Sequence, residues 1–430
     1  GTDGAFQRAS RGFMGQTWDG FESPWHYQEW VTEWATLLLS FVYPGAVLLA
    51  FGGTRTFHRL AAGLEDAGWI IADTIAWITG QGFPKSHNGR NWDAGEHWHG
   101  YGTALKPAWE GVVVARAPWR GTYAALAREF GTGAINVDGG RVGISPDEAG
   151  NSKDFRIKTP CQSSHIGIPL YAYDPNEKRI PVSRPHPLSV RYDALGRWPA
   201  NLILGCACES AEHDADCPVR LLGEQSGESG HSHWPQSDAN VFGTIAGQER
   251  KYDGAGTYDN IPGTAARFFY TAKAATWERE AGLGAFEHGL LRTYGDTGAH
   301  PNAKPNPQAA IPRRNAHPTV KPVRLTEYLA RLILPPALPQ PRRLLVPFAG
   351  SGSEMIGAHL AGWDVVHGIE QSADYAAIAR ARLAWWAQYA TYEQAQSAAG
   401  ADGREAAERE AARKLGVEQL ALFDSGGGMW

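Results

Sequence analysis

Residues 344–370, LLVPFAGSGSEMIGAHLAGWDVVHGIE, decide the fold. Their first apolar run predicts a buried strand, the glycine-rich turn Phe348–Gly352 follows, and a helix is predicted at 353–361. A second strand at 363–369 ends in Glu370, 18 residues after the last glycine of the turn. In doubly wound folds, a β-turn-α-β unit of this kind places a nucleoside over the turn, and the acid binds the ribose hydroxyls.

The turn does not match the dinucleotide pattern G-x-G-x-x-G, because Met355 stands where the third glycine would be. This departure favours a ligand without a pyrophosphate. Taken alone, the turn is equally compatible with an ordinary glycine-rich connection between a strand and a helix.

The flanking sequence alternates between predicted helices and strands. Apolar periodicity predicts helices at 25–43, 54–67, 323–334 and 373–389, and strands at 46–51, 69–78 and 112–116. We expect 46–51 to be a parallel strand covered on both faces, because it is a continuous apolar run. The alternation predicts an α/β fold. It fades between 117 and 315, where short runs at 201–204 and 267–270 are the only strand candidates.

The composition describes a globular protein: 430 residues, 43% of them hydrophobic, with a net charge of −5. We see no apolar stretch of about 18 residues that would span a membrane, and no signal peptide. Four cysteines form no disulfide framework and favour a reducing, cytoplasmic setting.

One long ordered pattern of motifs begins at residue 317. It consists of H-P-T-V-K-P at 317–322, a predicted helix, a proline-rich turn, F-A-G-S-G and then G-I-E. It resembles the DNA amino-methyltransferases, which methylate adenine N6 or cytosine N4 with S-adenosylmethionine, in the permuted β-type order and particularly in phage and prophage members. The resemblance implies a Rossmann-like methyltransferase sheet with helices on both faces and an irregular inserted target-recognition domain. The implied parts are an N-terminal half at 1–116, the insertion at 117–315, a cofactor half at 316–390 and a tail at 391–430.

The resemblance also implies the cofactor site. The turn would cradle the methionine part of S-adenosylmethionine, and Glu370 would bind its ribose. Thr319 and Lys321 would lie at the amino-acid end, with His317 orienting their loop. The expected cofactor-binding residues are Phe348, Ala349, Gly350, Ser351, Gly352, Glu370, His317, Thr319 and Lys321.

The sequence departs from the family pattern in two ways. Val346 stands where the family usually has Asp, and the catalytic loop (Asp/Asn/Ser)-Pro-Pro-(Tyr/Phe/Trp) is missing from the sequence. Ser23-Pro24-Trp25 is better explained as a helix start, and Leu334-Pro335-Pro336-Ala337 lacks both the polar residue and the aromatic. Since relatives carry the loop just before a segment like 12–19, we expect it to precede Gly1, and the catalytic residues stay unknown.

A second cluster has metal-ligand spacing. Cys206, Cys208, His213 and Cys217 offer four ligands suited to tetrahedral zinc, although C-x-C is tighter than the usual C-x2-4-C. The alternative is three ordinary reduced cysteines and a surface histidine.

Two further motifs concern the partners. Residues 151–200 carry eight Lys or Arg against four acids, which the resemblance favours as contacts to the backbone of double-stranded DNA. Pro160-Cys161-Gln162 matches the cytosine-C5 methyltransferase nucleophile motif, but a three-residue match occurs easily by chance. Near the C-terminus, Gln419, Leu420, Leu422 and Phe423 resemble the peptide that binds the bacterial replicative sliding clamp, the alternative being a segment folded back on the core.

The predicted function is therefore site-specific methylation of an exocyclic amino group on a flipped base, with adenine N6 favoured over cytosine N4. A methyltransferase for RNA or protein, and a cofactor-binding but catalytically incomplete DNA-binding fragment, remain as alternatives. The sequence does not indicate the recognition site, the oligomeric state or a restriction partner; a solitary phage-like enzyme in the bacterial cytoplasm is the expectation.

Overall fold

The structure is a computed structural model. It describes residues 20–80, 86–143, 171–174, 177–181, 196–208, 213–215, 217–226, 264–273, 275–287, 289–291 and 311–400. None of the helices in these ranges is long and apolar enough to cross a membrane.

A five-stranded mixed sheet forms the centre of the fold, in the order β1-β3-β2-β6-β7. Strand β3 runs antiparallel to its neighbours β1 and β2, whereas β2, β6 and β7 are mutually parallel. The carboxyl ends of β1, β2, β6 and β7 therefore lie at one edge of the sheet. The strands span Val47–Gly52 (β1), Ile70–Ile78 (β2), Trp109–Arg116 (β3), Leu202–Cys206 (β6) and Tyr270–Lys273 (β7).

The alternation of side chains along β3 divides the core into two layers. Val113 and Ala115 face α2 (Pro24–Leu38) and α3 (Phe57–Asp66), packing with residues such as Val31 and Leu64. Val112 and Val114 point the other way, towards α8 (Val323–Leu332). Helices thus cover both faces of an α/β sheet, which confirms the predicted fold class.

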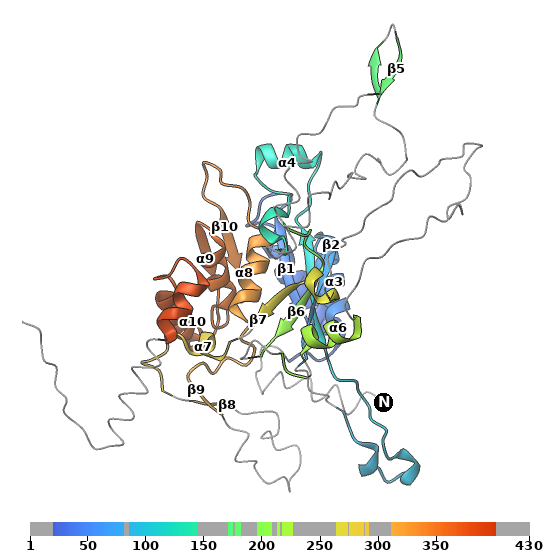
Figure 1. Ribbon diagram of the computed structural model, residues 1–430, viewed down its shortest axis with the longest axis vertical. Helices are drawn as coiled ribbons and strands as arrows, with labels where there is room; N and C mark the ends of the chain where they lie inside the picture. The colour runs from blue at the N-terminus through green and yellow to red at the C-terminus, as the bar shows by residue number, and fades with distance from the viewer. Residues whose placement is uncertain are drawn as a thin grey trace, which may run out of the picture.

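Residues 344–370 supply most of a second sheet. It is parallel and two-stranded, formed by β10 (Arg343–Val346) and β11 (Val365–Gly368). Helix α9 (Ser353–Ala361) connects these strands, and α10 (Ala373–Trp386) follows them. The predicted helix at 353–361 matches α9 residue for residue. Figure 1 shows α8 between the five-stranded sheet and the unit of β10, α9 and β11.

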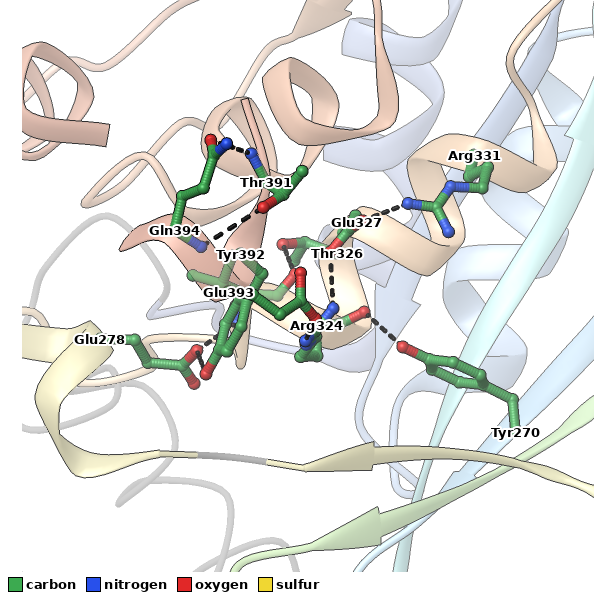
Figure 2. Close-up of polar contacts among 11 residues, drawn as sticks. Tyr270, Glu278, Arg324, Thr326, Glu327, Arg331, Thr391, Tyr392, Glu393 and Gln394 are labelled. Carbon is green, nitrogen blue, oxygen red and sulfur yellow. Dashed lines mark hydrogen bonds and ion pairs between the residues drawn. The ribbon is translucent and has the colours of Figure 1, made fainter. Parts of the chain in front are cut away.

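Helix α8 is buried on almost every side because it packs against both units. Leu325 and Leu329 face the five-stranded sheet. On its other side, a Cβ on Gly357 of α9 would lie 2.4 Å from the Thr326 backbone, so the two helices approach at a distance that only glycine permits. Tyr270 of β7 stacks on Tyr328, with 3.8 Å between ring centroids, and donates a hydrogen bond to the Arg324 carbonyl (Figure 2).

The remaining elements are short and lie outside these two sheets. Among the α-helices and strands they are α4 (Tyr123–Glu129), α6 (Pro218–Ser226), α7 (Thr276–Glu280), and the antiparallel strand pairs β4–β5 (Tyr171–Asp174, Glu177–Pro181) and β8–β9 (Gly289–Leu291, Ile311–Arg313). The domain boundaries remain predictions, although β6 and β7, from the expected insertion, extend the central sheet.

Three sequence predictions were wrong in detail. The run 267–270 begins in a 3-10 helix at Ala265–Phe268, and the strand starts only at Tyr270. Strand β1, expected to be parallel, is antiparallel to its neighbour β3, because β3 lies between β1 and β2 and runs opposite to both. The helical spacing of Leu37 and Phe41 predicts that they lie on the buried face of the helix at 25–43, but both are exposed, and the buried residues of α2 are Val31 and Ala35.

Candidate functional site

The turn between β10 and α9 is shaped by two glycines with left-handed backbones. Gly350 has φ +53° and Gly352 has φ +82°, conformations that L side chains rarely adopt. Gly350 also lies against the ring of His317, where a Cβ would come within 2.7 Å of Nε2. The backbone conformation therefore requires glycine at both positions, and the contact with His317 also requires it at Gly350.

Glu370, at the tip of β11, is held against this turn. Its Oε2 accepts the Gly350 N–H at 2.8 Å and its Oε1 accepts the Ser372 N–H at 2.8 Å. Each carboxylate oxygen can accept a second hydrogen bond. The side chain is only half-buried, so a bound hydroxyl can reach it.

The side chain of Arg382, on α10, is fully buried and donates hydrogen bonds to the same turn. One Nη donates to the Ser351 carbonyl at 2.6 Å, the Ser351 hydroxyl at 3.0 Å and the Ser353 hydroxyl at 3.2 Å. The other Nη donates to the Glu278 carbonyl at 3.1 Å. Burial lowers the pKa of Arg382 to about 10, which leaves it charged at neutral pH. Sequence reasoning missed this residue, because nothing separates it from the other arginines of an alanine-rich helix.

His317 presents its ring to the turn. Its backbone N–H donates to Asn315 Oδ1 at 3.1 Å. Its ring Nδ1 accepts the Thr319 N–H at 3.3 Å, which places any ring proton on Nε2, facing Gly350. Arg279 of α7 donates to the His317 carbonyl at 2.7 Å. Thr319 itself is exposed.

The surroundings of His317 keep its ring neutral. Burial lowers its pKa to about 4, and the nearby cations Arg279, Arg382 and Lys321 act in the same direction. At neutral pH the imidazole is therefore a hydrogen-bond donor without charge.

Lys321 connects the two halves of the molecule. Its ammonium forms an ion pair with Glu110 Oε2 of β3 at 2.5 Å and lies over the rings of Phe51 and Trp77, 4.6 and 5.2 Å from their centroids. An ammonium has three donors, so this pairing leaves capacity for another anion. All three of these partners lie at the sheet edge where β1 and β2 end.

Phe348 stands at the start of the turn with 55% of its surface exposed. Its ring contacts Trp30 and Trp34 of α2, with centroid distances of 5.6 and 5.5 Å. The turn therefore borders an aromatic wall supplied by the N-terminal half, which sequence reasoning did not predict. Ser23 caps α2, accepting the His26 N–H at 3.0 Å with Pro24 in the first turn, as expected from the sequence.

These residues fit a nucleoside that carries an amino-acid group. Gly350 and Gly352 leave the backbone of the turn open to close approach, and Glu370 can accept ribose hydroxyls. Lys321 can bind a carboxylate. The half-exposed aromatic ring of Phe348 can cover an apolar or cationic portion.

The four predicted metal ligands also come together. Their ligand atoms lie within 4.8 Å of one another, in Cys206, Cys208, His213 and Cys217. Two other predicted features, the clamp-like peptide at 419–423 and Pro160-Cys161-Gln162, lie outside the described residues, as does most of the basic stretch 151–200.

Comparisons with known proteins identify the family. A family model described as DNA methylase, of the N6/N4 type, matches residues 6–381. Among solved structures, the chain is similar to the crystal structure of an M1.HpyAVI–SAM complex, with 12% identity, a TM-score of 0.28, and coverage of 82% of this chain and 81% of that chain. No curated protein matches the sequence.

Proposed function

Because this chain belongs to the N6/N4 DNA methylase family, it is an S-adenosylmethionine-dependent DNA amino-methyltransferase, and we propose that the turn Phe348–Gly352 with Glu370 forms its cofactor site. The observation that carries the proposal is the hydrogen bond from the Gly350 N–H to Glu370, which joins the turn to the acid at the tip of β11. One link thus sets the backbone of the turn and the ribose acceptor in fixed positions.

Each site residue has a role in holding the cofactor. Glu370 binds the ribose hydroxyls, and the turn bounds the methionine portion. Lys321 faces the carboxylate, while neutral His317 positions the loop that carries Thr319. When bound, S-adenosylmethionine supplies an electrophilic methyl group that needs no metal for activation.

Transfer would form the N–C bond as the S–C bond of the cofactor breaks, releasing S-adenosylhomocysteine and one proton from the amino group, and it would depend on alignment of the two reactants in a site that excludes water. The turn accepts hydrogen bonds from Arg382 and donates one to Glu370. These bonds hold the cofactor side of the alignment in place. The aromatic wall of Trp30, Trp34 and Phe348 limits the access of water.

We propose adenine N6 as the acceptor on double-stranded DNA, with the target base flipped out of the stack before transfer. The family covers both adenine N6 and cytosine N4. Expressing the full-length gene in a host without DNA methylases of its own, followed by digestion of the DNA to deoxynucleosides and mass spectrometry, tests this directly. N6-methyl-2′-deoxyadenosine is expected; N4-methyl-2′-deoxycytidine in its place would overturn the choice of base.

A separate experiment tests cofactor binding independently of transfer. Calorimetric titration with S-adenosylmethionine is expected to show one site per chain, whose affinity falls in Glu370→Gln and is retained in Glu65→Gln. Glu65 is an exposed acid on α3 and serves as the matched control. Equal binding to wild type and Glu370→Gln would contradict the assigned site.

For the C-terminal peptide we propose binding to the replicative sliding clamp, supported by the sequence Gln419-Leu420-Ala421-Leu422-Phe423. Leucine and phenylalanine anchors suit an apolar groove. Purified clamp is expected to retain the wild-type chain and to lose Phe423→Ala. Equal retention of both proteins would exclude this peptide as the contact.

A further inference from the structure

The carboxyl end of β6 carries a second constellation of side chains that the methyl-transfer site does not use. Cys206 is the last residue of β6 and pairs with Lys273 of β7. Cys208 follows two residues later, and Cys217 immediately precedes α6. These three thiols are buried and free of disulfides.

The distances within this constellation match a shared metal ion. His213 Nδ1 lies 3.4 Å from Cys206 Sγ and 3.5 Å from Cys217 Sγ. Tetrahedral zinc, with Zn–S of about 2.3 Å and Zn–N of about 2.0–2.1 Å, sets neighbouring S and N ligands about 3.6 Å apart. All four ligand atoms lie within 4.8 Å of one another, against about 3.8 Å between two sulfurs of a tetrahedral zinc site, so one ion would draw the side chains together by about 1 Å at most.

Two contacts to the backbone suit a bound metal ion. The Asp214 N–H donates to Cys208 Sγ at 3.2 Å, a contact that orients a metal-bound sulfur and offsets its negative charge. Arg220 donates to the His213 carbonyl at 3.2 Å, which fixes the backbone that presents the imidazole. The ring nitrogen aimed at the sulfurs is Nδ1, and this nitrogen would be the ligand.

The local packing gives a reason for a metal. Among the residues that the structure describes, the buried cluster at this place consists of the three cysteines, with only Val219 packed against it. Helix α6 has no buried residue of its own. A helix without a buried apolar face needs another attachment, and ligands at the end of β6 and the start of α6 would supply one.

We propose that Cys206, Cys208, His213 and Cys217 bind one structural zinc ion that fastens α6 to the central sheet. Three thiolates and one imidazole in a closed set suit zinc and leave no position open for a substrate. The ion would also fix one wall of a small cavity, about 60 Å³, which the cysteines share with Trp77, Thr79 and Pro322. Pro322 adjoins Lys321, so the metal unit borders the loop of the proposed cofactor site.

Elemental analysis of protein purified without chelators tests the occupancy. About one equivalent of zinc per chain is expected, and less than about a tenth of an equivalent would overturn the proposal. Iron in place of zinc in the same measurement would overturn the choice of metal. Cys161→Ser is the matched control, because Cys161 is the only other cysteine of the sequence and its loss should leave the zinc content unchanged.

Cobalt substitution tests the ligand set without relying on a variant that fails to fold. The Co²⁺ protein is expected to show the intense visible bands of a tetrahedral ion and sulfur-to-cobalt charge transfer. His213→Cys should keep the metal and raise the charge-transfer absorption by about one third, since the thiolates increase from three to four. An unchanged spectrum in His213→Cys would exclude His213 as a ligand and contradict the proposed set.

Discussion

Arg382 donates from α10 to the carbonyl oxygen of Ser351 at 2.6 Å, inside the glycine turn that follows β10. A fully buried guanidinium thus supports the turn of the proposed cofactor site. Arg382 also donates to the Glu278 carbonyl of α7, 104 residues before it in the chain, so the same side chain joins the turn to α7.

Replacing Arg382 by methionine is expected to destabilise the protein by about 3 kcal/mol, because several buried acceptors lose their donor. Urea denaturation measures the effect. Arg380→Met, on the exposed side of α10, is the control and should stay within about 0.5 kcal/mol of wild type. If the two variants proved equally stable, the proposed support of the turn would be contradicted.

Gly350→Ala is expected to weaken S-adenosylmethionine binding by at least about tenfold. Its φ of +53° disfavours a side chain, and the new Cβ would meet His317. Gly284→Ala is the matched control, since its Cβ would meet nothing within 4 Å. Calorimetric titration of both variants makes the comparison, and retained affinity in Gly350→Ala would show that the cofactor does not depend on this turn.

Lys321→Met is expected to weaken S-adenosylmethionine binding about tenfold, the effect of losing one charge-assisted hydrogen bond. Glu110→Gln removes only the partner that orients the ammonium, so its effect should be smaller, less than about threefold. Binding titrations distinguish the two roles. A larger effect of Glu110→Gln would indicate that Lys321 serves the ion pair and not the ligand.

The stability of the protein should depend on pH through two buried groups with opposite signs. Burial raises the pKa of Glu278 to about 7, and the carboxylate accepts hydrogen bonds from Tyr392 and Val323 (Figure 2 shows the Tyr392 contact). The folded state therefore holds this proton more tightly than the unfolded state. The contribution of Glu278 to the free energy of unfolding falls by about 3 kcal/mol as the pH rises from about 4.5 to about 7.

His317 acts in the other direction. Its pKa of about 4 lies below the unfolded value of 6.5, so the unfolded state binds the proton more tightly. Its contribution is present above about pH 6.5 and is lost as the pH falls towards 4. The two effects oppose each other over nearly the same range.

Single substitutions should expose each contribution. In Glu278→Gln the free energy of unfolding is expected to rise more steeply between pH 5 and about 6.5 than in wild type, and in His317→Gln it should fall. Urea unfolding at several pH values measures both slopes. Parallel pH profiles for the three proteins would refute the assigned pKa shifts.

The sequence predicted those features that local patterns encode. Helix α9 was predicted with both ends correct, because Gly352 and the left-handed Gly362 bound an apolar run. The cofactor residues could be proposed from the turn and from Glu370. Contacts between distant segments could not be predicted from the sequence. The ion pair of Lys321 with Glu110, for example, joins residues that are 211 positions apart. Strand β7 was misplaced because a run as short as Arg267 to Tyr270, with three aromatic residues, does not distinguish a strand from a 3-10 helix.

The central claim is that Glu370 binds the ribose of S-adenosylmethionine. It is tested most directly by measuring the affinities of wild type and Glu370→Gln for S-adenosylhomocysteine and for its 2′-deoxy analogue. In wild type, loss of the hydroxyl should weaken binding by at least about tenfold, the contribution of a hydrogen bond to a charged group. In Glu370→Gln this difference should shrink to about threefold or less. An undiminished difference in the variant would show that another residue binds the ribose and would contradict the assigned site.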